Sequence, residues 1–346
     1  MVRVAINGFG RIGRAFFKMA HEHPDFEIAA INDIGDVENF AYLLNYDTSY
    51  GRFPVEASTR EKDGKDFLVV GGKEIAFFSV REPSRLPWED QRIDIVVEAT
   101  GAFESYEKAK VHLTAGAKRV IITAPVKDDP SSVGISGATV LMGVNDATLG
   151  TCSISSNASC TTNAASPLIA ILKASVGIEK ALLNTVHAYT ASQSVVDGPS
   201  SKKSLRDGRA AAQNIIPSST GAAVATTKAH TDLEGKFDGI ALRVPVVVGS
   251  IVDVTFLASK QTSAEEVNDA LRIAAVSPEW SSLFAVTDEP VVSSDIIGAR
   301  YAAIADLSMT RVVGGDLVKV LAWYDNEMGY TSTLLQHVAT VAKLLQ

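Results

Sequence analysis

The chain has 346 residues, of which 46% are hydrophobic and 21% are charged, proportions that are typical of globular proteins with room for two domains. Its net charge of −8 argues against nucleic acid or an anionic membrane as a required partner, because both would repel it. We expect no membrane span, since no apolar stretch is long enough, and no basic-then-apolar leader after Met1. With only two cysteines, we expect a cytoplasmic protein that acts on a small molecule and has no metal site.

The first half of the chain alternates short β-branched runs with helical patterns, which predicts βαβ units and a parallel sheet. Strands are expected at residues 2–6, 27–32, 93–99 and 119–123, and helices at 11–21 and 104–115. A Gly71-Gly72 turn between two further strand-like runs predicts an inserted hairpin.

A Gly-x-Gly-x-x-Gly motif between the first strand and the first helix consists of Gly8, Phe9, Gly10, Arg11, Ile12 and Gly13. Its glycines permit a tight turn, so that the helix N-terminus can hold a pyrophosphate. Asp33, at the end of the second strand, is expected to bind the ribose of NAD and to repel the extra phosphate of NADP. An ordinary turn and a helix cap are the alternatives, but strand, spacing and acid together favour a Rossmann-type NAD-binding domain.

The second half of the chain has longer strand-like runs, at residues 182–189, 239–248, 252–258, 301–306 and 317–324, with one helix pattern at 264–275. This order predicts an α+β domain with a mostly antiparallel sheet, so the chain as a whole is of the α/β class. Residues 190–219 are rich in Ser, Lys, Arg, Gly and Pro and predict a long polar loop, which in a compact domain is usually functional.

Cys160 precedes an apolar, helix-forming stretch that runs from Ala164 to Val176. The unpaired N–H groups and the dipole at a helix start stabilise a thiolate, the form of cysteine that attacks carbonyl carbon. A buried, inert cysteine is the alternative interpretation. His187, at the end of a strand-like run, is a candidate base for this thiol, although a lone histidine at such a position is more often structural.

Five ordered segments carry further motifs, at residues 6–14, 158–163, 215–223, 243–245 and 323–327. Together they resemble phosphorylating glyceraldehyde-3-phosphate dehydrogenases over essentially the whole chain. The resemblance implies a glycolytic reaction, the oxidation of D-glyceraldehyde 3-phosphate to 1,3-bisphosphoglycerate with NAD, through a thiohemiacetal and a thioester on Cys160. It further implies that His187 is the acid/base and that the protein is a homotetramer.

The resemblance also implies ligands for two phosphate groups. They are Thr190 and Arg243 for the substrate, and Ser159, Thr161, Thr220 and Gly221 for inorganic phosphate. Hydroxyl and backbone N–H groups donate to phosphate oxygens, and a guanidinium adds a bidentate, charged contact. By the same resemblance, Asn326 holds the nicotinamide amide, and Thr100 and Thr123 lie along the cofactor.

We therefore expect an NAD-binding Rossmann domain at 1–159, onto which a C-terminal helix at 327–346 docks, and a catalytic domain at 160–326 that includes the polar loop. Erythrose-4-phosphate dehydrogenase is an alternative that shares the scaffold but usually lacks the Thr190 pattern. A non-catalytic NAD-binding regulator is another, although it would not need Cys160, His187 and Arg243. The stretch 200–205 is slightly longer than its equivalent in close relatives.

Overall fold

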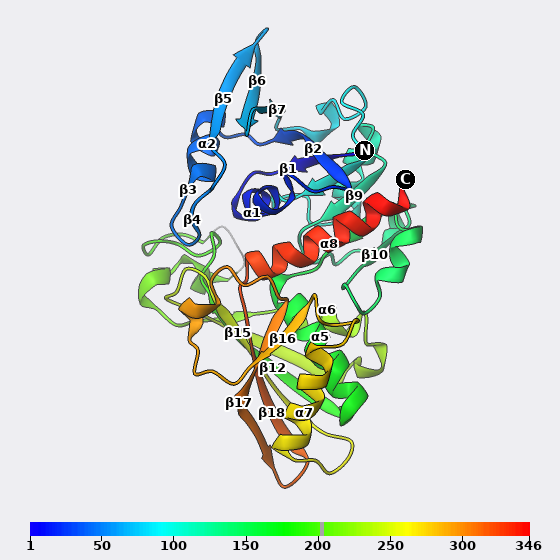
Figure 1. The fold of residues 1–346 in the computed structure, drawn as a ribbon, viewed down its shortest axis with the longest axis vertical. Helices are drawn as coiled ribbons and strands as arrows, with labels where there is room; N and C mark the ends of the chain where they lie inside the picture. The colour runs from blue at the N-terminus through cyan, green and yellow to red at the C-terminus, as the bar shows by residue number, and fades with distance from the viewer. Residues whose placement is uncertain (201–203) are drawn as a thin grey trace. The chain divides into compact units, whose positions relative to one another are not determined.

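The structure, a computed structural model, describes residues 1–200 and 204–346 and divides the chain into two compact units (Figure 1). The first unit comprises Met1–Ala158 and Leu334–Gln346, and the second comprises Ser159–Thr333. Residues 201–203, part of the predicted polar loop and of its longer stretch, lie outside the described residues. Among the helices in the described ranges, none combines the length and the apolar character needed to cross a bilayer.

The first unit is built on a nine-stranded sheet in the order β10-β11-β9-β8-β1-β2-β7-β6-β5. The strands are β1 (Val2–Asn7), β2 (Phe26–Asn32), β5 (Ala57–Lys62), β6 (Lys65–Val70), β7 (Lys73–Phe78), β8 (Ile95–Glu98), β9 (Arg119–Ile122), β10 (Gly137–Thr139) and β11 (Ile154–Ser156). All neighbouring pairs from β10 to β7 are parallel, whereas β7, β6 and β5 pair antiparallel. The predicted parallel sheet and the hairpin at Gly71-Gly72 are confirmed, and β5 extends that hairpin as an edge strand that was not predicted.

The helices of the first unit pack against this sheet. They are α1 (Arg11–Ala20), α2 (Val37–Asn45), α3 (Tyr106–Ala109) and α4 (Val111–Thr114), with short 3-10 helices η1 (Pro83–Arg85), η2 (Pro130–Val133) and η3 (Asp146–Thr151), and a small ribbon of β3 (Tyr46–Asp47) and β4 (Gly51–Arg52). The helix predicted at 104–115 is two short helices, because the backbone tightens at Lys110, whose carbonyl accepts from the Leu113 N–H. Leu334 and Val338 of α8 (Met328–Leu344) share one buried apolar core with Phe16 and Phe17 of α1.

The second unit is built on a seven-stranded sheet in the order β13-β14-β12-β15-β18-β17-β16. Its strands are β12 (Lys180–Ala188), β13 (Ile216–Ser219), β14 (Phe237–Val244), β15 (Ser250–Leu257), β16 (Phe284–Thr287), β17 (Ala303–Val313) and β18 (Leu317–Tyr324). The β12–β14 and β16–β17 pairs are parallel and the other neighbouring pairs are antiparallel, so the predicted mostly antiparallel sheet is confirmed.

Three helices pack together on one face of the second sheet: α5 (Cys160–Ser175), α6 (Ala222–Thr227) and α7 (Ala264–Ala275). Short 3-10 helices are η4 (Leu205–Gly208), η5 (Ala211–Gln213), η6 (Thr231–Leu233) and η7 (Ser293–Ile296). Helix α7 matches its predicted range, because a capping box between Ser263 and Glu266 marks its start.

Two strands of the second unit differ from their predicted lengths. Strand β14 ends at Val244 rather than at residue 248, because Pro245 has no N–H to donate to a neighbouring strand. Strand β17 continues past residue 306 to Val313, with a register shift between Asp306 and Arg311 that the sequence pattern did not reveal.

Candidate active site

A cavity of about 500 Å³ lies at the carboxyl ends of β1, β2 and β8, where strand order runs outward in both directions from β1. This is the position at which open parallel sheets bind dinucleotides. Its lining comprises Asn7, Gly8, Gly10, Asn32, Asp33, Ile34, Val80, Arg81, Pro83, Ala99, Thr100, Ala102 and Phe103. Four predicted cofactor residues, Gly8, Gly10, Asp33 and Thr100, are therefore brought together here.

The three motif glycines have different surroundings in this cavity. Gly8 has φ +97°, and a Cβ atom there would lie 2.5 Å from the Thr100 nitrogen. A Cβ on Gly13 would lie 2.1 Å from the Gly8 carbonyl oxygen, whereas a Cβ on Gly10 would have no neighbour within 4 Å. Gly8 and Gly13 thus allow the turn to pack closely, and Gly10 leaves the cavity side open. This cradle fits the pyrophosphate of NAD, which the backbone N–H groups at the start of α1 would hold.

The Asp33 carboxylate is held at the edge of the cavity by two backbone groups. Its oxygens accept from the Phe9 N–H at 2.6 Å and from the Gly35 N–H at 3.1 Å. Arg81 lines the same cavity and was missed in the sequence, because the parallel pairing of β7 with β2 that brings it there has no local signal.

Other predicted cofactor residues do not line the cavity. Phe9, Arg11, Ile12 and Gly13 belong to the turn and the start of α1, whereas Thr123 follows β9 and its hydroxyl donates to the Glu98 carbonyl at 3.0 Å. Phe9 is fully buried, with its ring edge-on to Phe17 at a centroid distance of 5.7 Å. Arg11 forms an ion pair with Asp47 at 2.9 Å.

In the second unit, Cys160 and His187 are in direct contact. Cys160 is the first residue of α5, and the Ser159 hydroxyl caps this helix by accepting from the Thr162 N–H at 3.1 Å. His187 lies near the end of β12, and its Nε2 is 3.2 Å from the Cys160 Sγ. The imidazole is only 3% exposed, whereas Cys160 is partly exposed. A base within hydrogen-bonding distance of a thiol is the arrangement that thiol catalysis requires.

Arg243 completes this group from the neighbouring strand β14, because it lies opposite His187 in the parallel β12–β14 register. Its Nη1 is 2.5 Å from the His187 Nδ1 and 3.3 Å from the Ala188 carbonyl oxygen. The Arg243 Nε is buried without a hydrogen-bond partner, and within the described ranges the guanidinium forms no ion pair with a carboxylate. An anionic ligand would supply what this guanidinium lacks.

Burial and, to a smaller extent, the charge of Arg243 lower the pKa of His187 to about 3. The imidazole is therefore neutral near pH 7 and available to accept a proton. Burial also raises the pKa of the Cys160 thiol, while Arg243, the Thr161 hydroxyl and backbone N–H groups at the helix start lower it. Burial thus outweighs the helix-start effect expected from the sequence.

Tyr324 links these elements and was not singled out in the sequence. Its hydroxyl is hydrogen-bonded to the Thr161 hydroxyl at 2.9 Å and to the Thr185 hydroxyl at 2.8 Å. Its ring lies edge-on to that of His187. Burial raises the pKa of Tyr324, so the phenol stays protonated and positions the imidazole without charge. The signal available was its place at the end of a strand, two residues before Asn326.

The remaining predicted phosphate ligands are Thr190, Thr220 and Gly221, and the two threonine hydroxyls are hydrogen-bonded to residues close to them in the chain. The Thr190 hydroxyl is 2.9 Å from the Ser192 hydroxyl, and the Thr220 hydroxyl accepts from the Ala222 N–H at 3.1 Å. Gly221 is exposed at the start of α6. In the part of the chain that the structure describes, no hydrogen bond joins Thr190 or Thr220 to the Cys160–His187–Arg243 group.

Asn326 has a defined side-chain orientation. Its Oδ1 accepts from the Gly249 N–H at 3.2 Å and from the Ser250 hydroxyl at 3.0 Å. These two donors turn the amide nitrogen away from them, which leaves that nitrogen as the end suited to donate to a carboxamide oxygen.

Comparison with known proteins matches both parts of the chain to one family. Residues 2–106 match the family described as glyceraldehyde 3-phosphate dehydrogenase, NAD binding domain, and residues 159–326 match its C-terminal domain. The glyceraldehyde-3-phosphate dehydrogenase of Clostridium acetobutylicum is 44% identical over 348 residues, with 99% of each chain covered. Those of Mycobacterium avium and Neurospora crassa are 45% and 44% identical over 99% of this chain, and over 99% and 98% of their own length. The chain belongs to the glyceraldehyde-3-phosphate dehydrogenase family.

Family membership confirms the resemblance inferred from the five motifs and identifies the first unit as an NAD-binding domain. Every residue that lines the cavity at β1 falls within the match to the NAD binding domain of the glyceraldehyde-3-phosphate dehydrogenase family. Cys160, His187 and Arg243 fall within the match to its C-terminal domain. The cavity at β1 therefore belongs to the first unit, and the Cys160–His187–Arg243 group belongs to the second.

Proposed function

We propose that this protein catalyses the phosphorylating oxidation of D-glyceraldehyde 3-phosphate to 1,3-bisphosphoglycerate with NAD. The observation that carries the proposal is the 3.2 Å contact between the Cys160 Sγ and the His187 Nε2, beside an arginine with no carboxylate partner in the described ranges. Such a pair has little use in a protein that only binds NAD, which makes a non-catalytic regulator the weaker interpretation.

In the first step, the Cys160 sulfur attacks the aldehyde carbon while His187 Nε2 takes the thiol proton. The carbonyl oxygen becomes a hydroxyl when this proton is returned to it, which yields a thiohemiacetal on Cys160. The Cys160 backbone N–H and His187 are suited to stabilise negative charge on this oxygen during the addition. Because His187 is neutral before the step, it can act as a base without first losing a proton.

NAD supplies the acceptor for the hydride that the substrate carbon loses. His187 takes the hydroxyl proton of the thiohemiacetal as that hydride departs, so a thioester remains on Cys160. An oxygen of inorganic phosphate then attacks the thioester carbon, the carbon–sulfur bond breaks, and His187 returns its proton to the sulfur. Covalent capture retains the oxidation energy in the acyl group until phosphate arrives.

Two anion sites in the second unit are part of the proposal. We assign Arg243 and Thr190 to the phosphate of the substrate, because Arg243 provides an unsatisfied guanidinium beside the reacting thiol. Inorganic phosphate is assigned to Ser159, Thr161, Thr220 and Gly221. The Thr161 hydroxyl is also hydrogen-bonded to the Tyr324 hydroxyl.

For the cofactor, the glycine cradle fits the pyrophosphate, Asp33 the adenosine ribose, and the oriented Asn326 amide the nicotinamide. We assign residues 1–159 with 327–346 to the NAD-binding domain and 160–326 to the catalytic domain. Both cysteines are free thiols, which supports a cytoplasmic location, since reducing compartments maintain that form.

The test is an assay of the purified protein with D-glyceraldehyde 3-phosphate, NAD and phosphate, followed by the absorbance of reduced cofactor. We expect sustained turnover with phosphate, and a single burst of about one NADH per active site without it. Erythrose 4-phosphate serves as the matched aldehyde. Oxidation of erythrose 4-phosphate but not of glyceraldehyde 3-phosphate, or NAD binding without turnover of either, would contradict the proposal.

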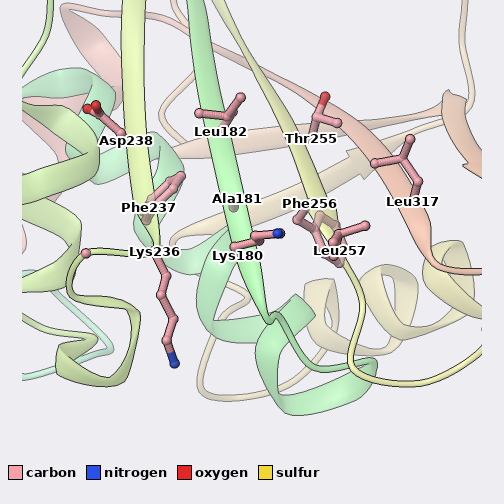
Figure 2. Close-up of a pocket in the computed structure, with 11 residues that line it drawn as sticks. Lys180, Ala181, Leu182, Lys236, Phe237, Asp238, Thr255, Phe256, Leu257 and Leu317 are labelled. Atoms are coloured by element: carbon pink, nitrogen blue, oxygen red, sulfur yellow. The ribbon is translucent and has the colours of Figure 1, made fainter.

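We also propose that the protein assembles as a homotetramer. The face of the second sheet opposite α5 exposes apolar side chains, with Leu182 at 66%, Ile240 at 56% and Leu317 at 41% exposure. Figure 2 shows Leu182, Thr255 and Leu317 around a pocket of about 360 Å³ on this face. An apolar sheet face of this kind is typical of a contact between subunits. A Leu182→Asp variant should shift the mass measured by light scattering from tetramer to smaller species, and an unchanged mass would remove this face from the proposal.

A further inference from the structure

A buried carboxylate of the first unit is hydrogen-bonded to residues that line the cavity but is not itself part of the lining. Glu98, the last residue of β8, has a side chain only 1% exposed. Its carboxylate accepts from the Asn7 Nδ2 at 2.5 Å, from the Thr100 N–H at 2.8 Å and from the Thr100 hydroxyl. The fourth contact, at 2.9 Å, is to the Nε2 of His112, a fully buried residue of α4.

The Trp88 indole and the Asn32 amide determine which atoms donate and which accept in this network. The indole of Trp88 has only a donor, and its Nε1–H is 3.1 Å from the His112 Nδ1. His112 therefore carries its proton on Nε2, directed at Glu98, and is neutral. Asn7 Oδ1 accepts from the Asn32 Nδ2 at 2.7 Å, which directs the Asn7 Nδ2 toward Glu98. Four donors and no acceptor therefore surround the carboxylate.

The register of the sheet connects this buried charge to the cavity. Asn7 lies opposite Asn32 of β2 on one side and opposite Glu98 of β8 on the other, at the carboxyl ends of all three strands. Asn32 in turn accepts from the Val80 N–H at 2.9 Å and donates to the Val80 carbonyl at 3.0 Å. Asn7, Asn32, Val80 and Thr100 all line the cavity, whereas Glu98 and His112 do not.

We propose that Glu98 and His112 are positioning residues for NAD. The carboxylate fixes the Thr100 backbone and the Asn7 amide, and through Asn7 it fixes Asn32, so the cavity has its binding shape before the cofactor arrives. A preformed site avoids the ordering of side chains that otherwise opposes binding. The inference deepens the proposed function, and it rests on that function for its kinetic readout alone.

Glu98→Gln is the decisive variant, because it keeps the shape and replaces one acceptor by a donor. The new amide meets at least one N–H or O–H group that has no other acceptor, so no arrangement restores all four contacts. We expect the Kd for NAD, measured by titration of the protein without substrate, to rise about tenfold or more. The KM for NAD should rise by the same factor, while kcat and the KM for the aldehyde should change by less than about twofold.

A pair of His112 variants separates positioning from simple packing. His112→Gln keeps an N–H near the place of Nε2, whereas His112→Leu fills the space without a donor. We expect His112→Leu to weaken NAD binding as Glu98→Gln does and His112→Gln to recover most of the affinity. His230→Leu, at a buried histidine of the second unit, is the matched control and should leave the Kd for NAD unchanged.

Amide hydrogen exchange of the protein without NAD supplies a readout that stability alone would not move. In Glu98→Gln the Thr100 amide should exchange faster, while amides of β1 such as Ile6 should keep their protection. An unchanged Kd for NAD in Glu98→Gln would overturn the inference. So would a parallel loss of NAD affinity, aldehyde affinity and melting temperature in both Glu98→Gln and His112→Leu. A wild-type protein that binds NAD but oxidises no aldehyde would overturn the proposed function and leave this inference intact.

Discussion

The two units differ in how they pair a buried charged side chain, the Glu98 carboxylate in the first and the Arg243 guanidinium in the second. In the first unit, Glu98 accepts hydrogen bonds from Asn7, Thr100 and His112. In the second unit, Arg243 lies against a neutral imidazole, and its Nε is buried without a partner. A buried charge whose hydrogen bonds are all formed within the protein stabilises the structure around it. A buried charge with an unpaired donor costs free energy until a ligand pairs with it.

This difference matches what each site is proposed to hold. The cavity proposed for NAD is held in shape by hydrogen bonds within the protein, so its buried carboxylate needs no ligand as a partner. The substrate phosphate must be bound, and its product released, at every turnover, which an unsatisfied guanidinium permits. Burial alone therefore does not distinguish a positioning residue from a ligand-binding residue. The difference is whether the buried charge already has its hydrogen-bond partners within the protein.

Cys160→Ser should separate the two units most sharply. Without the thiol, turnover should fall by about 10⁴-fold or more, while the Kd for NAD should stay near its wild-type value. Cys152→Ser is the matched control, because this cysteine is buried in the first unit and donates to the Thr148 carbonyl. Iodoacetate followed by peptide mapping supplies the check, and activity lost through labelling of Cys152 would show that the nucleophile is misassigned.

His187→Asn should slow the hydride step by about 10²–10⁴-fold, because proton transfer by a positioned side chain contributes this much. The rate of Cys160 alkylation should also fall, since burial alone raises the pKa of the thiol. Single-turnover absorbance measures the first effect and timed iodoacetate labelling the second. A near-normal rate of NADH formation would contradict the role of His187 as the base.

Arg243→Ala tests the unsatisfied guanidinium directly. The kcat/KM for glyceraldehyde 3-phosphate should fall by roughly 10- to 100-fold, as expected for a lost hydrogen bond to a charged group of about 1.5–3 kcal/mol. The pKa of Cys160 should also rise further, because Arg243 lowers it in the wild-type protein. Arg272→Ala, on exposed α7, is the control. Unchanged steady-state kinetics would show that Arg243 has a structural role only.

The last prediction concerns the pH dependence of stability, to which one buried histidine in each unit contributes. Burial lowers the pKa of His337 in the first unit to about 3, as it does with Arg243 for His187 in the second. Between pH 6.5 and pH 3 the unfolded chain binds protons that the folded protein excludes. The contribution of these two histidines to stability is therefore full above pH 6.5 and falls as the pH drops below it. Each histidine contributes a slope of about 1.4 kcal/mol per pH unit.

His337→Gln should remove the contribution of one histidine to the slope of unfolding free energy against pH. Urea denaturation at a series of pH values between 5 and 6.5 would measure the change, with Leu344→Ala at the exposed end of the same helix as a control that does not titrate. An unchanged slope in His337→Gln would show that His337 does not remain neutral in the folded protein.

Local patterns were sufficient for much of the fold. The glycine motif between β1 and α1, the alternation of the first half and the apolar runs of β12, β15 and β18 each placed an element near its observed bounds. The errors had both local and tertiary causes. Pro245 ends β14, a register shift lengthens β17, and Lys110 divides one predicted helix into two.

The sequence by itself determined the family, the Rossmann-type first sheet and the residue types of both sites, because glycines, a cysteine at a helix start and ordered motifs carry that information locally. Only the tertiary structure decided that Cys160 meets His187, that Arg243 lies beside them across the β12–β14 pair, and that Glu98 is held by Asn7 and His112. These contacts join residues far apart in the chain. Strand order, register and burial set them, and with them the pKa of each reacting group.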